Sequence, residues 1–114
     1  MASFKMSLEF SRDFEQLKTR AAKGQLGAQK LLKLLDDAKK ELSLDISAGE
    51  KIQKNLWPKE YVQKYGINNL WKFNLNSYWR LIYTLIGTKV ELLIIYLDFM
   101  DHKRYERKFG YKKG

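Results

Sequence analysis

The chain has 114 residues, of which 45% are hydrophobic and 14% aromatic, and its formal net charge is +9. This length and apolar content predict a single domain, residues 1–114, with a core of its own, and they exclude a disordered basic tail. The absence of cysteine and the presence of one histidine exclude disulfides, thiol catalysis and histidine-rich metal sites.

The first apolar residues alternate with polar ones, which is typical of a half-buried strand. They are Phe4, Met6, Leu8 and Phe10. Ser11 then offers an N-cap oxygen, and apolar residues at helical spacing predict a helix over about residues 11–23.

A second helix is predicted after Gly24 and Gly27, because apolar residues again recur at helical spacing. They are Leu31, Leu34, Leu35, Ala38 and Leu42. The short connection favours a helical hairpin. Residues 45–58 have no regular pattern, and residues 59–65 predict a short helical turn that ends at Gly66.

From Ile67 onward the pattern is that of strands. Aromatic and β-branched residues predict strands over about residues 71–76, 78–86 and 90–99, with a short turn at Gly87-Thr88. The predicted order is therefore β-α-α-β-β-β. We expect an α+β fold, with a helical hairpin on one face of an antiparallel sheet and a short helix or loop at the C-terminus.

Arg80 lies in the middle of an apolar strand, and the register of its hairpin decides where it points. A two-residue loop would place Arg80 opposite Phe73, among aromatic side chains. A three-residue loop, Asn76–Tyr78, instead pairs Phe73 with Leu81 and leaves one face wholly apolar. The second register fits the binary pattern better. It predicts that Arg80 lies beside Asn74 on the face away from the helices, which we expect to be open.

The polar segment after the last strand can reach Arg80. His102 and Tyr105 are three residues apart, so they share a side if this segment is helical. Cleavage of RNA by its own 2′-hydroxyl needs a base, a cation for the charged phosphorane and an acid for the leaving oxygen, and no metal. Arg80, His102 and Tyr105 could supply these groups. Equally, Arg80 could be a solvated charge, His102 a surface or capping residue, and Tyr105 a packing residue at the sheet rim.

Positive charge is concentrated towards the C-terminus, where residues 101–114 contain six basic and two acidic side chains. Such a surface favours a polyanionic partner, most often nucleic acid, although it could also be a solvated helix face. The residues we expect to bind RNA are Asn74, Lys103, Arg104, Arg107 and Lys108. No apolar run is long enough for a membrane span, and the first residues lack the layout of a secretory signal. We therefore expect a cytoplasmic protein.

Three segments resemble the RelE/ParE superfamily of toxins from toxin–antitoxin systems. They are residues 69–75 (NLWKFNL), residues 78–83 (YWRLIY) and residues 101–105 (DHKRY). The predicted element order matches as well, so the resemblance covers nearly the whole chain. It implies a metal-independent mRNA endoribonuclease that acts on the ribosome or on free mRNA, needs no cofactor, inhibits translation and is neutralised by a small antitoxin protein.

The same resemblance implies roles for four residues. Arg80 would stabilise the phosphate, Lys72 would act as base or charge stabiliser, and Tyr105 would match the C-terminal tyrosine. His102 is similar to the histidine of the HigB and YoeB branches, which takes part in acid–base chemistry. Asn74 stands where RelE has a second strand lysine. Two other functions remain open: a ParE-like gyrase inhibitor or inactive relative of the same fold, and a small RNA-binding domain unrelated to toxins.

Overall fold

The computed structural model describes residues 2–87 and 92–110. In chain order the elements are β1 (Ala2–Met6), α1 (Leu8–Ala22), α2 (Leu26–Leu44), β2 (Glu50–Lys51), the 3₁₀ helix η1 (Lys54–Leu56), α3 (Lys59–Tyr65), β3 (Trp71–Asn74), β4 (Trp79–Gly87), β5 (Leu92–Asp101) and α4 (His102–Phe109). This confirms the α+β class and the α1–α2 hairpin. The expected turn at Gly87-Thr88 and the expected strand start at Val90 involve residues outside the described ranges.

The five strands form one sheet in the order β1-β5-β4-β3-β2. The pairs β3–β4 and β4–β5 are antiparallel, as predicted. The short strand β2, which was not predicted, also pairs antiparallel with β3, whereas β1 runs parallel to β5. A parallel neighbour requires a crossover connection, and the α1–α2 hairpin lies within the long connection from β1 to the other strands. The sheet is therefore mixed rather than wholly antiparallel.

The predicted register of the central hairpin is confirmed. Phe73 pairs with Leu81, and Asn74 pairs with Arg80. The Asn76 side chain fixes the turn, since its Oδ1 accepts hydrogen bonds from the backbone N–H groups of Tyr78 and Trp79, at 2.8 and 2.7 Å. The helical turn over residues 59–65 is also confirmed as α3, which ends at Gly66 with a left-handed φ of 59°.

The start of α1 differs from the prediction. Ser7, not Ser11, is the N-cap, and its Oγ accepts a hydrogen bond from the Phe10 N–H at 3.0 Å. Leu8 and Phe10 are therefore helical, with Leu8 72% and Phe10 1% exposed. The alternating pattern ran past the end of the strand because Phe10 also belongs to the buried stripe of the helix.

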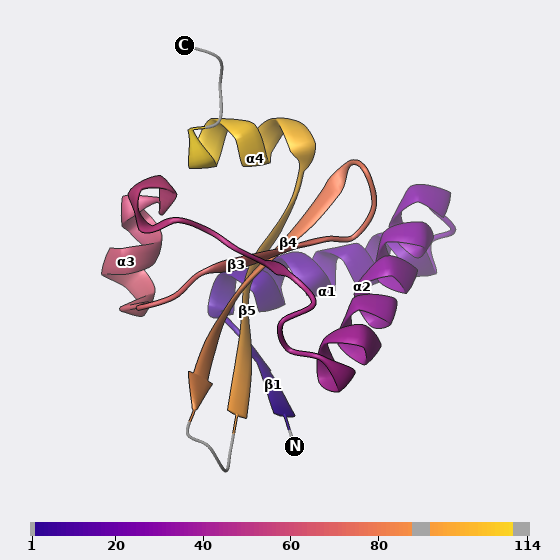
Figure 1. Cartoon of the computed structure of the whole chain (residues 1–114). Helices are drawn as coiled ribbons and strands as arrows, with labels where there is room; N and C mark the ends of the chain where they lie inside the picture. Colours follow the sequence, from indigo (N-terminus) through magenta and orange to yellow (C-terminus); the bar gives the residue numbers. More distant parts are fainter. Residues whose placement is uncertain (1, 88–91, 111–114) are drawn as a thin grey trace.

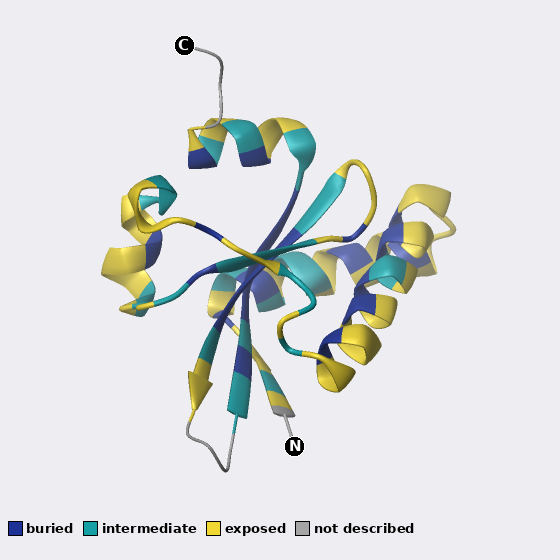
Figure 2. Cartoon of the chain, in the orientation of Figure 1, coloured by how far each residue is buried: buried dark blue, intermediate teal, exposed yellow. Residues whose placement is uncertain are grey.

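Two layers of apolar side chains enclose the sheet. The first cluster lies between the sheet and the α1–α2 hairpin, and it includes Phe10, Leu31, Leu81 and Tyr83. The middle of β4 and of β5 is buried, while the outer surfaces of the helices are exposed (Figure 2). Alternation along β4 therefore sends Leu81 and Tyr83 towards the hairpin and Arg80 away from it, as predicted.

The second face of the sheet is not open, contrary to expectation. In Figure 1, α4 lies above the strands and α3 to their left, away from the α1–α2 hairpin. Tyr61 of α3 joins Tyr105 and Phe109 of α4 in a second buried cluster with Ile82 of β4. Tyr105 and Phe109 are four residues apart, so α4 presents an apolar stripe that needs a surface to cover it. Because α3 and α4 cover this face of the sheet, Arg80 lies at the rim of the second cluster.

Candidate active site

The β3–β4 turn holds the guanidinium of Arg80 in place. Its Nη1 donates hydrogen bonds to the backbone oxygens of Asn76 at 3.1 Å and Trp79 at 3.3 Å. Because the Asn76 side chain also bonds the turn, the arginine is anchored to a fixed segment of backbone. Its second terminal nitrogen, Nη2, remains directed towards α4.

The end of β5 places His102 against this guanidinium. Asp101 pairs with Trp79 at the last position of the β4–β5 ladder, and it is also the N-cap of α4. Its side chain accepts a hydrogen bond from the Arg104 N–H at 2.9 Å. His102, the first residue of the helix, then lies with its Nδ1 3.3 Å from Arg80 Nη2. The ordered transition from strand to helix thus determines where the imidazole lies.

Lys72 and Tyr105 lie together beside this pair. The Lys72 Nζ is 5.1 Å from the centre of the Tyr105 ring, a cation–π distance, and 3.7 Å from Glu50 Oε1. Tyr105 is only 3% exposed, and its ring stacks on Phe109 at 4.6 Å between centroids. Tyr105 therefore belongs to the second cluster and also lines the surface hollow described next.

The four predicted catalytic side chains line one cavity of about 210 Å³, together with Glu106. The lining side chains are Lys72, Arg80, His102, Tyr105 and Glu106. Glu106 was not predicted. Its signal in the sequence is its position four residues after His102, and its Oε2 lies 3.3 Å from His102 Nε2. Two cations and an imidazole around one hollow form a site that can hold an anionic group.

The predicted RNA-binding residues divide into two groups. Asn74 is exposed and pairs with Arg80, and Lys103 and Arg107 are exposed on α4. Arg104 instead approaches Asp98, with 3.6 Å between Nη2 and Oδ2. Lys108 forms an ion pair with Glu60 of α3. The structure thus places Asn74 beside Arg80 on the neighbouring strand, Arg104 against β5 and Lys108 against α3.

Asp98 is a buried carboxylate that was not predicted as a functional residue. It lies on β5, where the Tyr61 hydroxyl donates a hydrogen bond to Oδ2 at 2.9 Å. Burial raises the pKa of Asp98 above its ordinary value of 3.8, and Arg104 and the Tyr61 hydrogen bond oppose that rise. The same environment raises the pKa of Tyr61, with burial as the main cause. Asp98 therefore links α3 to α4. The signal for Asp98 in the sequence is an acidic residue inside an otherwise apolar strand.

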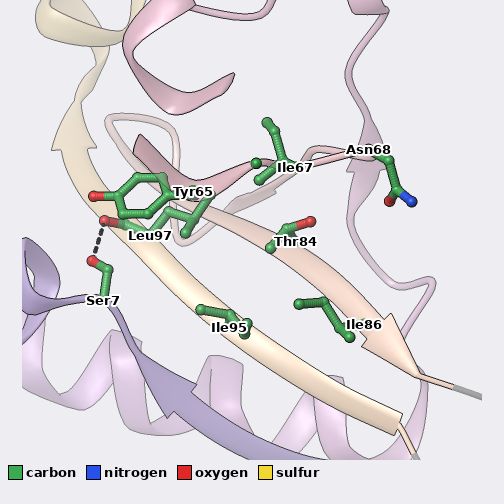
Figure 3. Close-up of a pocket in the computed structure, with 9 residues that line it drawn as sticks. Ser7, Tyr65, Ile67, Asn68, Thr84, Ile86, Ile95 and Leu97 are labelled. Atoms are coloured by element: carbon green, nitrogen blue, oxygen red, sulfur yellow. Dashed lines mark hydrogen bonds between the residues drawn. The ribbon is translucent and has the colours of Figure 1, made fainter. Parts of the chain in front are cut away.

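A second cavity, of about 320 Å³, lies beside α3 and is shown in Figure 3. Its walls are largely aliphatic and include Ile67, Ile86 and Ile95. Its hydroxyls are already committed, since Ser7 Oγ donates to the Leu97 oxygen at 2.9 Å and Thr84 Oγ1 donates to the Asn69 oxygen at 2.7 Å. No charged residue is among its described lining residues, so the Arg80 cavity is the candidate for phosphate chemistry.

The chain resembles known proteins in its fold but not detectably in its sequence. No protein-family model matches the chain, and no curated protein sequence gives a significant match. A solved structure, the YoeB/ParE toxin from Agrobacterium tumefaciens, superposes with a TM-score of 0.62 over 88% of this chain and 98% of that chain, at 12% sequence identity. The fold is that of a YoeB/ParE toxin.

The YoeB/ParE fold confirms the architecture that the sequence resemblance implied. At 12% identity the match concerns the fold. Within the described ranges, no helix is both long and apolar enough to cross a bilayer.

Proposed function

We propose that this chain is the toxin of a type II toxin–antitoxin system and that it is an endoribonuclease that cleaves mRNA and inhibits translation. The observation that carries the proposal is the convergence of Arg80, His102 and Lys72 on one cavity, with 3.3 Å between Arg80 Nη2 and His102 Nδ1. The YoeB/ParE fold and the charge of +9 support it.

In the proposed reaction, the RNA 2′-hydroxyl attacks the adjacent phosphate. The new P–O2′ bond forms as the P–O5′ bond breaks, giving a 2′,3′-cyclic phosphate and a free 5′-hydroxyl. Arg80 stabilises the negative charge on the phosphorane, and Lys72 acts as the base or as a second source of positive charge. His102 protonates the leaving 5′ oxygen. Tyr105 lines the cavity beside Lys72.

The alternative function, a ParE-like gyrase inhibitor, does not require the arrangement seen in the cavity. The structural relative carries the names of both the YoeB and the ParE branch, so the fold does not separate them. A protein that only binds gyrase has no need for an imidazole placed 3.3 Å from a backbone-anchored arginine. This arrangement favours the nuclease. We propose a cytoplasmic location, mRNA as substrate, on the ribosome or free, and a cognate antitoxin protein as partner.

Primer extension on cellular mRNA after induced expression tests the proposal. We expect new 5′ ends within minutes of induction, and a loss of about 100- to 1000-fold in cleavage rate for Arg80→Ala, because one charge-stabilising donor is removed. Arg20→Ala, an exposed arginine on α1, is the matched control and should cleave at the wild-type rate. Growth arrest without new RNA ends, or full cleavage by Arg80→Ala, would reject the nuclease and its site.

A further inference from the structure

His102 is held from both sides of its ring. Its Nδ1 lies 3.3 Å from Arg80 Nη2, and its Nε2 lies 3.3 Å from Glu106 Oε2. The two partners come from different elements, since Arg80 is on β4 and Glu106 is one helical turn further along α4. An imidazole with both nitrogens engaged has a defined orientation.

The chemistry of these partners decides where the ring carries its proton. A guanidinium has donors and no acceptor, so Nδ1 takes part in the Arg80 contact only as an acceptor. An ionised carboxylate only accepts, so the Glu106 contact needs a hydrogen on Nε2. A neutral ring with its proton on Nε2 satisfies both contacts together. A second proton, on Nδ1, would face the guanidinium N–H directly and would break that contact.

We propose that Glu106 is a positioning residue that fixes His102 as the Nε2–H tautomer, so that Nδ1 is the atom that exchanges a proton with RNA. Arg80 occupies Nδ1 until an anionic phosphate enters the cavity and takes the guanidinium. This inference rests on the proposed nuclease function and adds to it the proton-carrying atom and the residue that selects it.

The proposal accounts for the protons of the cleavage step. Entry of the phosphate draws the Arg80 guanidinium away and frees Nδ1, which can then take up a second proton from solvent. As the P–O5′ bond breaks, that proton passes from Nδ1 to O5′, and the ring returns to the neutral Nε2–H form. The proton lost by the 2′-hydroxyl goes to Lys72, which acts as the base in this step. Throughout the step Glu106 keeps its contact with Nε2–H, so the ring does not need to turn.

Nuclear magnetic resonance of the imidazole tests this without any RNA. His102 is the only histidine, so the imidazole signals belong to it, and couplings to the two ring C–H protons distinguish Nδ1 from Nε2. At alkaline pH, where the ring is neutral, we expect the wild-type protein to show the Nε2–H tautomer and a ring N–H protected from solvent exchange. Glu106→Ala should expose that proton to exchange and make the Nδ1–H tautomer detectable. Glu106→Gln keeps an acceptor oxygen and should restore the wild-type pattern.

Glu15→Ala, on the exposed surface of α1, controls for the loss of one negative charge and should leave the ring signals unchanged. A wild-type ring in the Nδ1–H form, or a Glu106→Ala spectrum equal to that of the wild type, would overturn the proposal. Inorganic phosphate is the probe for the role of Arg80. At constant pH it should move the Nδ1 signal towards the protonated form. A ring that does not respond at any phosphate concentration would refute that role.

Cleavage assays then separate this inference from the proposed function. Glu106→Ala should lower the cleavage rate by about 10- to 100-fold, which is a smaller loss than removal of the His102 imidazole would cause. Glu106→Gln should recover most of the wild-type cleavage rate. If the wild-type protein cleaves no RNA while the tautomer results hold, the nuclease function fails and the assignment of the ring proton stands. If RNA is cleaved at full rate by Glu106→Ala, Glu106 has no positioning role.

Discussion

At the scale of single residues, Tyr105 combines a packing role with a position in the cavity. Its ring is 3% exposed and stacks on Phe109, while Lys72 Nζ lies 5.1 Å from the ring centre. Tyr105→Phe keeps the ring and its stacking on Phe109, so we expect the free energy of unfolding to change by about 1 kcal/mol or less. Tyr105→Ala leaves a cavity in the second cluster and should cost about 3–5 kcal/mol.

Urea denaturation of both Tyr105 variants measures these losses, and cleavage of RNA by the folded Tyr105→Phe protein reports on the hydroxyl. Full activity of Tyr105→Phe would mean that the tyrosine serves packing alone. A Tyr105→Ala protein as stable as the wild type would contradict the packing role of the ring.

The sequence predicted the candidate site only as far as strand alternation fixes the face of the sheet to which each side chain points. Alternation placed Arg80 on the face away from the hairpin, because a one-residue shift would have put a charge in the core. It could not reveal Glu106, whose relation to His102 depends on α4 beginning at residue 102. That start is determined by the Asp101 cap at the end of β5. Arg104 and Lys108 lie against Asp98 of β5 and Glu60 of α3 because the apolar stripe of α4 faces the sheet.

At the scale of elements, Glu9 ties α1 to α3. The Tyr65 hydroxyl donates to Glu9 Oε1 at 2.6 Å, and Lys64 Nζ lies 3.2 Å from Oε2. These contacts, Tyr65 first, lower the pKa of Glu9 from 4.5 to about 2. A lowered carboxyl pKa stabilises the fold above the unfolded-state pKa, and this stabilisation is lost as the pH falls towards about 2.

Glu9→Gln should therefore be less stable than the wild type at neutral pH, and the difference should shrink as the pH falls from about 4.5 to about 2. Urea titrations at a series of pH values measure the difference. Glu15 pairs with Lys18 of the same helix, so Glu15→Gln is the control for the loss of one charge. A gap that stays constant with pH would show that Glu9 acts through packing rather than through its charge.

Asp98 links α3 to α4 and should show the opposite pH dependence. Burial raises its pKa, so its contribution to stability is complete below the ordinary value of 3.8 and is lost as the pH rises through the raised value. Asp98→Asn keeps an acceptor for the Tyr61 hydroxyl and carries no charge. Its stability relative to the wild type should therefore increase as the pH rises over that range, measured by urea unfolding. A relative stability that falls instead would mean that the Arg104 ion pair outweighs the cost of burial.

The elements that were predicted well are those with a long periodic pattern. The stripe of α2 and the alternation of β4 each have several repeats, and Gly66 marks the end of α3. The two-residue strand β2 has no period to detect, and it forms because β3 offers a free edge. The cover on the second face was missed because Tyr61, Tyr105 and Phe109 belong to short segments whose packing partners lie far away in the sequence.

At the scale of the whole molecule, the sheet separates two surfaces with different charge arrangements. On the hairpin side, Lys33 and Lys40 are paired with Asp37 and Asp36 along α2. On the other side, Lys103 and Arg107 are exposed on α4, one turn apart and next to His102 and Glu106. Of the net charge of +9, these two side chains are the ones that an RNA strand would meet near the reacting phosphate.

Salt dependence of RNA binding distinguishes the two surfaces. Each phosphate of a single strand that the protein neutralises contributes about 0.7 to the slope of log K against log salt concentration. If Lys103 and Arg107 each contact one phosphate, the Lys103→Ala/Arg107→Ala double variant should lower the magnitude of that slope by about 1.4. Lys33→Ala/Lys40→Ala removes the same charge from α2 and should leave the slope unchanged. Fluorescence anisotropy with a 2′-O-methyl oligonucleotide, which cannot be cleaved by its own 2′-oxygen, gives both slopes. Equal slopes for the two double variants would show that RNA responds to net charge alone, and would remove α4 from the binding surface.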